Sequence, residues 1–181
     1  ILHMETKVET PVKPVNLVSS SDILELAAKY KGADLGTFMD RLFQMADRLQ
    51  IRPDWMLKVM LHESGLNPKA INSIGATGLI QIKPEVAIGL GTTTAELAQM
   101  SGAEQLHYIE KFWKPAKGKV SSYADLRLYN LFPIAVGKPS TFILECNELS
   151  AYAVASRNPS FDLDGDMKIS VGEFREKVSH E

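Results

Sequence analysis

The sequence predicts a mainly α-helical fold with minimal β structure. Three observations lead to this prediction. Apolar residues recur at helical spacing over residues 23–30, 38–49 and 55–61. Later in the chain, several polar residues are followed three positions on by an acidic residue, which is a signature of helix starts. The chain has 181 residues, of which 45% are hydrophobic, and is therefore long enough to bury one sizeable core.

Three helices are expected after residue 20. Asp22, with Glu25 three residues on, is the expected N-cap of a helix that ends at Gly32. A second helix is expected after Thr37. Pro53 can occupy the first turn of a third helix, because the N–H that proline lacks would be unpaired there anyway. This third helix is apolar on most sides, so we expect it to be buried.

The rest of the chain alternates between breaks and further helices. Residues 65–82 contain three glycines and an Asn-Pro pair, so turns and short strands are expected there, with any β structure confined near residues 70–82. Another helical stretch is expected over residues 140–157, and it would enclose the single cysteine, Cys146, as a packed thiol. Three residues have the spacing of helix N-caps: Thr93, Ser101 and Ser122.

Three segments are predicted from this pattern. Residues 1–20 are expected to be a cloning remnant followed by a flexible arm, residues 21–140 the main helical domain, and residues 141–181 a set of C-terminal helices around an acidic loop. The first twenty residues lack the order of a secretory signal, and no window has the apolar length of a membrane span. The protein is therefore expected to reach its target by a route other than its own signal peptide.

The charge and composition of the chain limit the classes of partner that we expect. A net charge of −2, with 20 basic against 22 acidic residues and no basic run, makes nucleic acid a poor candidate. The four histidines are scattered and have no cysteine partner, so a structural zinc site is not expected. We expect a monomer with no organic cofactor and no insertion into a membrane.

One acidic residue has an unusual position. Glu63 stands near the C-terminal end of the apolar third helix and is followed by a stretch rich in Gly, Asn and Ser. Burial disfavours the charged form of a carboxyl group and raises its pKa, so such a group can keep its proton near neutral pH. That is the property a general acid needs when it protonates the oxygen of a departing sugar. A solvated helix-terminal glutamate is the structural alternative.

The residues that follow Glu63 resemble the sequence of a known enzyme family. Glu63-Ser64, Asn67-Pro68, Gly75-Ala76 and Gly78-Leu79-Ile80-Gln81 resemble the core of the soluble-type lytic transglycosylases of the lysozyme-like superfamily. Ile80 stands where methionine is usual, and the family's later A-Y-N-A-G element is reduced to Tyr129-Asn130. The resemblance covers roughly residues 52–135 and is stronger for phage-encoded members.

This resemblance implies a lysozyme-like fold and a reaction. Glu63 would be the sole catalytic acid/base, and peptidoglycan glycan strands would be cleaved between N-acetylmuramic acid and N-acetylglucosamine with formation of a 1,6-anhydro sugar. Ser64, Gly78, Gln81, Tyr129 and Asn130 would lie around the substrate. Ser64 can instead bond backbone near the helix end, and Tyr129 can instead pack in the core. The phage-like features imply delivery to the bacterial wall in a virion or at lysis.

Two other functions stay open at this stage. A water-using muramidase would need a second carboxylate, for which Asp54, Glu85 and Asp125 are candidates, at roughly 6.5–9.5 Å from Glu63 in an inverting enzyme. Alternatively, the reduced third element is compatible with a catalytically inactive virion protein that only binds the cell wall.

The segment DLDGDMKISVGE, residues 162–173, resembles an EF-hand calcium loop. Met167 stands at the sixth position, where glycine normally takes the sharp turn, and this departure is expected to strain the loop. We expect a Ca²⁺ ion with a structural role at this loop. The alternatives are a calcium-responsive module and an Asp-rich surface turn that binds no ion. The expected ligands are Asp162, Asp164, Asp166, Lys168 through its carbonyl, Ser170 and Glu173.

Overall fold

The computed structural model describes residues 20–181. The arm predicted for residues 1–20 lies outside this range except for Ser20, the first residue of a helix. The helices are α1 (Ser20–Ala27), α2 (Leu35–Leu49), α3 (Pro53–Ser64), α4 (Pro84–Gly89), α5 (Thr94–Gln99), α6 (Gly102–Trp113), α7 (Tyr123–Leu131), α8 (Ala151–Arg157) and α9 (Val171–Ser179), with short 3₁₀ turns at Lys114–Ala116, Pro133–Ala135 and Pro159–Phe161. The mainly helical prediction is confirmed over the described residues.

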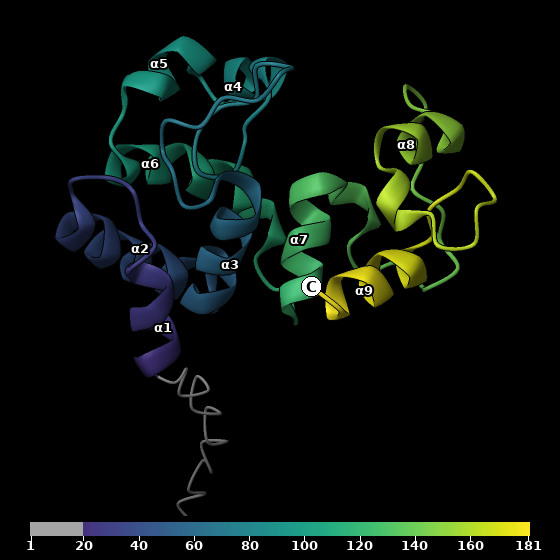
Figure 1. The fold of residues 1–181 in the computed structure, drawn as a ribbon, viewed down its shortest axis with the longest axis horizontal. Helices are drawn as coiled ribbons and strands as arrows, with labels where there is room; N and C mark the ends of the chain where they lie inside the picture. Colours follow the sequence, from purple (N-terminus) through teal and green to yellow (C-terminus); the bar gives the residue numbers. More distant parts are fainter. Residues whose placement is uncertain (1–19) are drawn as a thin grey trace, which may run out of the picture.

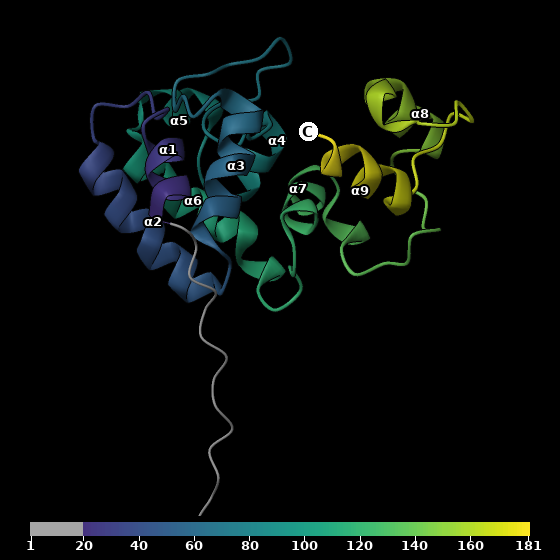
Figure 2. The ribbon, with the colours of Figure 1, turned by 60° about the horizontal axis from the view of Figure 1, so that its bottom comes forward.

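Two apolar clusters form the core. Helices α1 to α6 make one lobe, α8 and α9 make the other, and α7 lies between them (Figures 1 and 2). In the larger cluster, α2 packs on α6 and α1 on α3, around side chains such as Phe38, Met60 and Trp113 that have no exposed surface. Leu126 of α7 belongs to this cluster, whereas Leu128 belongs to the smaller one. The boundary predicted at residue 140 stays a prediction, and α7 contributes to both clusters.

The predicted helix caps are largely confirmed. The side chains of Thr93, Ser101 and Ser122 accept hydrogen bonds from the backbone three residues on, and Ser101 forms a reciprocal capping box with Glu104. Pro53 occupies the first turn of α3, as expected. One helix, α4, was not anticipated, although it also begins at a proline.

The predicted starts of the first two helices were wrong by three residues. Helix α1 begins at Ser20, so Asp22 lies in its first turn. A carboxylate there interacts favourably with the positive end of the helix dipole. Helix α2 begins at Leu35, after Asp34, and not after Thr37. The Asp34 carboxylate makes tertiary contacts instead of capping the helix, since it accepts from the Tyr30 hydroxyl at 2.6 Å and from the Ala103 N–H at 3.1 Å.

The helix expected over residues 140–157 is also wrong in its first half. Only α8 is helical there, because the backbone of residues 142–144 pairs with the acidic loop. The Leu144 N–H donates to the Ile169 carbonyl at 2.8 Å, and the Val171 N–H donates to the Phe142 carbonyl at 2.9 Å. Cys146 consequently lies in an exposed turn and is not a packed thiol.

The β structure is limited to isolated bridges in the described chain. Two of them, Ile71 with Thr77 and Thr77 with Ile82, lie in the predicted region. Two more, Ile143 with Ser170 and the bridge within the Cys146 turn, lie outside it, so the expectation that β pairing stays near residues 70–82 is wrong.

Candidate active site

Helix α3 delivers Glu63 to the surface of the larger lobe. The buried side of the helix, which includes Met56 and Met60, anchors it in the core. Gly65 ends the helix in the left-handed conformation, at φ 66°, and its N–H donates to the Leu61 carbonyl at 2.9 Å. Because this cap stops the helix immediately after Ser64, Glu63 stands in its last turn, with the chain turning away beside it.

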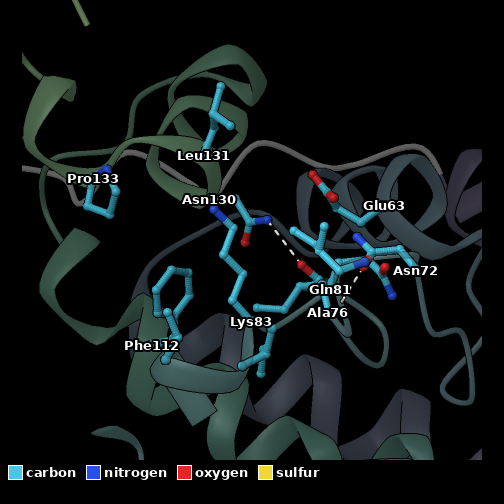
Figure 3. A pocket seen from close by; sticks show the side chains of 13 residues that line it. Glu63, Asn72, Ala76, Gln81, Lys83, Phe112, Asn130, Leu131 and Pro133 are labelled. Carbon is cyan, nitrogen blue, oxygen red and sulfur yellow. Dashed lines mark hydrogen bonds between the residues drawn. The ribbon is translucent and has the colours of Figure 1, made fainter. Parts of the chain in front are cut away.

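Glu63 lines a cleft of about 240 Å³ (Figure 3). The cleft lies between the end of α3, the loop of residues 72–83, and the facing ends of α6 and α7. Its walls combine apolar side chains with a few polar groups, a composition suited to binding an organic ligand. Its lining consists of Glu63, Asn72, Ile74, Ala76, Ile80, Gln81, Ile82, Lys83, Val86, Phe112, Asn130, Leu131 and Pro133.

The carboxyl group of Glu63 has a raised pKa. Burial is the main cause, because it disfavours the ionised form. The positive charge of Arg127 and hydrogen bonding by the Asn130 side chain both lower the pKa, while the Glu181 carboxylate raises it, and the net direction is upward. Glu63 can therefore hold its proton to higher pH than an exposed glutamate does.

The Asn130 amide is held in one orientation beside Glu63. Its Oδ1 accepts from the indole N–H of Trp113 at 3.1 Å, and its Nδ2 donates to the Ile80 carbonyl at 3.3 Å. Because an indole nitrogen can only donate, the Asn130 oxygen must face Trp113 and the amide N–H groups must face the cleft side. Trp113 has no exposed surface, so this orientation is fixed by the core.

A buried glutamine shapes the loop that forms one wall of the cleft. Gln105 Oε1 accepts from the Leu79 N–H at 3.0 Å, and its Nε2 donates to the carbonyls of Pro68 and Leu97 at 2.6 and 3.0 Å. Gly78 lies directly against this side chain at φ +86°, and a Cβ there would come within 2.6 Å of Gln105 Oε1. Only glycine therefore fits at this point of the wall.

The structure places two of the five predicted substrate-binding residues on the cleft. Gln81 and Asn130 line it together with Glu63. Gln81 has a positive φ of 57°, and its Nε2 donates to the carbonyls of Ala70 and Gly78 at 3.1 and 3.0 Å, which holds this sparsely populated backbone conformation.

The other three predicted residues have structural contacts. The Ser64 hydroxyl donates to backbone, at 2.8 Å from the Leu79 carbonyl and 3.0 Å from the Met60 carbonyl. Gly78 is buried against Gln105, as described above. The Tyr129 hydroxyl donates to the Phe112 carbonyl at 3.0 Å, and burial raises the pKa of Tyr129, so this hydroxyl stays protonated. For Ser64 and Tyr129, these are the structural alternatives that the sequence had left open.

None of the three candidate second carboxylates lines the cleft. Asp54 pairs with Arg52 at 3.0 Å in the first turn of α3, nine residues before Glu63 and about 13 Å along the helix axis. The Asp125 carboxylate accepts from the Ser121 N–H at 3.0 Å, just before the start of α7, and lies 3.4 Å from Arg175. Glu85 is exposed on α4. Among the residues that line the cleft, Glu63 is the only acidic one.

Sequence reasoning missed the residues that support the site. Trp113, Gln105 and Phe112 belong to α6, which carries no recognisable element of the site motif. A polar residue on the apolar face of a helix was a usable signal for Gln105, because a buried amide must find hydrogen-bond partners. The contact of Trp113 with Asn130, 17 residues away, had no signal in the sequence.

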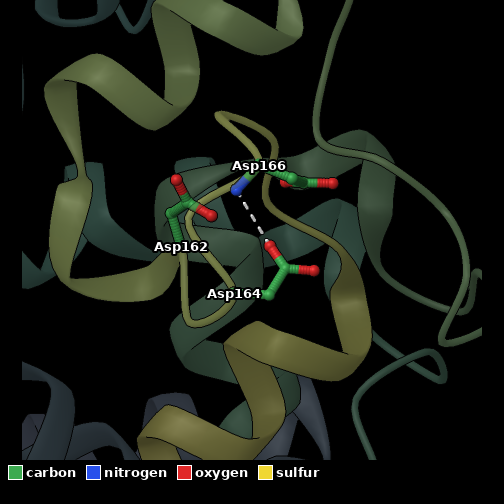
Figure 4. Close-up of side chains that lie close together, drawn as sticks. All are labelled: Asp162, Asp164 and Asp166. Atoms are coloured by element: carbon green, nitrogen blue, oxygen red, sulfur yellow. Dashed lines mark hydrogen bonds between the residues drawn. The ribbon is translucent and has the colours of Figure 1, made fainter.

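The acidic loop brings together three of its six predicted ligands. Asp162, Asp164 and Asp166 converge within the loop, with one carboxylate oxygen of each within 4.8 Å of the others (Figure 4). Glu173 is not part of this group. Its carboxylate accepts from the N–H groups of Leu163 and Ser170 at 2.8 and 3.0 Å.

The remaining loop positions serve the backbone turn. The Ser170 side chain caps α9, and the Lys168 N–H donates to Asp166 Oδ1 at 2.9 Å. Met167 adopts φ 63°, the left-handed conformation that glycine normally supplies at this position, so the expected departure from unstrained backbone is present.

Comparison with known proteins agrees with this site. Residues 41–104 match the family described as Transglycosylase SLT domain, a segment that is about a third of the chain and includes Glu63 and Gln81. A search of curated proteins found no match. Members of the SLT family are lytic transglycosylases, which are glycan-cleaving lyases acting on the peptidoglycan of the cell wall, and the match over residues 41–104 supports an activity of that class. Over residues 20–181, the structure contains no helix with the length and apolar character needed to cross a bilayer.

Proposed function

We propose that the protein cleaves the β-1,4 bond between N-acetylmuramic acid and N-acetylglucosamine and forms 1,6-anhydro-N-acetylmuramic acid, with Glu63 as the sole acid/base. The observation that supports this proposal most is that Glu63 is the only acidic side chain on the cleft and has a raised pKa. A reaction that needs one carboxyl group fits such a site better than one that needs two.

In this reaction, Glu63 first acts as an acid. Its protonated carboxyl gives the proton to the glycosidic oxygen, the bond from that oxygen to the anomeric carbon breaks, and N-acetylglucosamine leaves with a hydroxyl group. The muramic acid then has an oxocarbenium-like centre, which its own acetamido group stabilises. The Asn130 amide, held by Trp113, is positioned to donate to the Glu63 carboxylate that results.

Glu63 next acts as a base. Its carboxylate takes the proton of the C6 hydroxyl of the same muramic acid, whose oxygen bonds to the anomeric carbon and closes the 1,6-anhydro ring. The proton that Glu63 lost is thereby regained, and no water is consumed. The cleft lining includes the apolar side chains of Ile80, Phe112 and Leu131, which limit the access of water, the competing nucleophile.

Mass spectrometry of digested sacculi tests this proposal. Wild-type protein is expected to release muropeptides lighter by one water than the hydrolytic products, and Glu63→Gln is expected to lose at least about 100-fold in rate because the acid/base is absent. Glu85→Gln is the matched control, since Glu85 is exposed on α4 and does not line the cleft. Reducing-end products would identify a muramidase, particularly if Glu85→Gln also abolished them. Binding to sacculi without any release would identify an inactive wall-binding protein.

We also propose that the enzyme is delivered to the wall by a phage. The support is the resemblance of residues 104–115 and 125–138 to phage-encoded transglycosylases. Detection of the protein in purified virions would indicate a role in infection, and its detection only in lysates would indicate a role in release. Absence from both would refute the proposal.

We further propose that the loop of residues 162–173 binds one calcium ion that stabilises the smaller lobe. Oxygens on opposite sides of a Ca²⁺ ion lie about 4.6–5.2 Å apart, so the three aspartates, within 4.8 Å of one another, fit one ion. The loop is anchored on both sides, by the buried Ile169 and by stacking of Phe161 on Phe174 at 4.7 Å. Glu173 would complete the site only after leaving its backbone partners.

Thermal unfolding with calcium or with a chelator tests the calcium site. Calcium at about 100 times its dissociation constant is expected to add about 2.7 kcal/mol, and hence about 5–10 °C in Tm. Asp164→Asn is expected to remove most of this gain, and Asp40→Asn, a change of an exposed aspartate on α2, is expected to keep it. Equal Tm values in calcium and chelator would refute the site. A calcium effect on sacculus digestion well below Tm would instead indicate a regulatory role.

A further inference from the structure

A buried arginine lies behind the cleft. Arg127 is 4% exposed and precedes Asn130 on α7 by about one helical turn, so the two side chains share a face. Its Nη2 donates to Glu181 Oε1 at 3.0 Å, while Nε and Nη1 are buried without a hydrogen-bond partner among the described residues. Leaving such groups unpaired costs about 1–3 kcal/mol each, so the position of this cation needs an explanation beyond packing.

The surroundings of Arg127 connect it with the end of α3. The described chain ends beside α7, at the point marked C in Figure 1, and places Glu181 there. Glu181 Oε2 lies 3.8 Å from His62 Nδ1, the residue next to Glu63. Burial, followed by the charge of Arg127, lowers the pKa of His62, so this imidazole is neutral at neutral pH. The same arginine acts electrostatically on Glu63.

Two charges act on Glu63, those of Arg127 and Glu181, and they offset each other. Arg127 supplies one positive charge, and Glu181, in direct ion-pair contact, supplies one negative charge. An ionised Glu63 would be a second carboxylate for one cation in a partly buried place, where charges are screened less than at the surface. Conversely, the positive charge of Arg127 lowers the pKa of Glu63 and therefore favours a Glu63 carboxylate that forms briefly during the reaction.

We propose that Arg127 and Glu181 form a positioning pair behind Glu63 and decide when the catalytic carboxyl holds or releases its proton. Arg127 favours the carboxylate, and Glu181 offsets that effect by neutralising Arg127. Neither residue lines the cleft, so both act through Glu63. The inference rests on Glu63 being the acid/base of the proposed reaction.

Other ionisable groups lie near this cluster. From α3 there are Lys58 and His62, from α7 Tyr123 and Asp125, from α9 Arg175, and from the cleft wall Lys83. Burial raises the pKa of Tyr123, so its hydroxyl is neutral, and Asp125 and Arg175 neutralise each other as a pair. Of the charged groups, Arg127 and Glu181 are the ones that shift the pKa of Glu63.

Titration of Glu63 by NMR tests the proposal without any substrate. The protein is labelled with ¹³C at the glutamate δ carbons, and the Glu63 signal is assigned by its loss in Glu63→Gln. In Glu181→Gln, the uncompensated Arg127 charge is expected to move the Glu63 midpoint to lower pH. In Arg127→Met, the midpoint is expected to move to higher pH. Arg127→Lys keeps the charge and is expected to titrate close to wild type, which separates charge from packing if Arg127→Met does not fold.

Glu110→Gln is the matched control for these variants. Glu110 also pairs with an arginine, Arg48, at 2.6 Å, and is not among the charges that act on Glu63. Its replacement is expected to leave the Glu63 midpoint unchanged. A Glu181→Gln midpoint equal to that of Glu110→Gln would overturn the proposal.

The pH dependence of sacculus clearance gives a second readout. Because Glu63 must start protonated, its ionisation sets the alkaline limb, which is expected to move in the same direction as the NMR midpoint. Each half-unit displacement changes the rate on that limb about threefold. If wild-type protein cleaves no sacculi, the proposed function fails, and the NMR titration still decides whether the pair acts on Glu63. Shifted midpoints with an unshifted rate profile would overturn the link to catalysis.

Discussion

Replacing Gly78 by alanine is expected to destabilise the protein and to disturb the cleft. A Cβ at this position would lie 2.6 Å from Gln105 Oε1 and 3.0 Å from its Cδ. Gln105 cannot simply swing aside, because it is 1% exposed and its amide makes hydrogen bonds to Leu79, Pro68 and Leu97. The backbone at φ +86° adds a second penalty for any residue with a Cβ.

The size of the effect follows from these two terms. The left-handed conformation costs alanine about 1–2 kcal/mol. Moving a buried amide off its partners costs about 1–3 kcal/mol more. The sum of about 2–5 kcal/mol corresponds to a Tm lower by about 4–20 °C for a chain of this size.

Differential scanning calorimetry checks this value, with Gly91→Ala as the control. Gly91 has φ +89°, and a Cβ added there would meet no other atom within 4 Å, so its replacement is expected to show the conformational penalty alone. A Tm loss for Gly78→Ala no larger than that for Gly91→Ala would refute the reasoning about Gln105.

Three further outcomes follow from the contacts of the site. Burial raises the pKa of Glu63 above its unfolded value, so its contribution to stability is fully present at low pH and is lost as pH rises through the folded pKa. Glu63→Gln is therefore expected to raise Tm at pH 8 and to change it little at pH 4. Thermal melts in which the variant gains stability at pH 4 and not at pH 8 would contradict the burial of this carboxyl. Tyr129→Phe removes the hydrogen bond to the Phe112 carbonyl. It is expected to lower the free energy of unfolding in urea by about 1 kcal/mol and to keep activity. A large loss of rate with unchanged stability would place the hydroxyl in the reaction. Ser64→Ala is expected to behave alike, because its hydroxyl bonds backbone and does not line the cleft.

Local patterns were sufficient to predict the class of fold and the position of the acid. Helical apolar spacing, Pro53 in a first turn and the caps at Ser101 and Ser122 depend on residues within one or two turns of each other, and these elements formed as expected. The approximate place of Glu63, at the end of a buried helix before a glycine-rich loop, follows from the same local information.

Tertiary contacts decided the rest. Residues 142–144 are not helical because they pair with a loop about 25 residues away, and the Asp34 carboxylate accepts hydrogen bonds from Tyr30 and Ala103 instead of capping α2. The orientation of Asn130 depends on Trp113, and the charge near Glu63 depends on Glu181, more than 100 residues later. No short-range periodicity contains such pairings, because they exist only once the two apolar clusters have packed and removed water from between these groups.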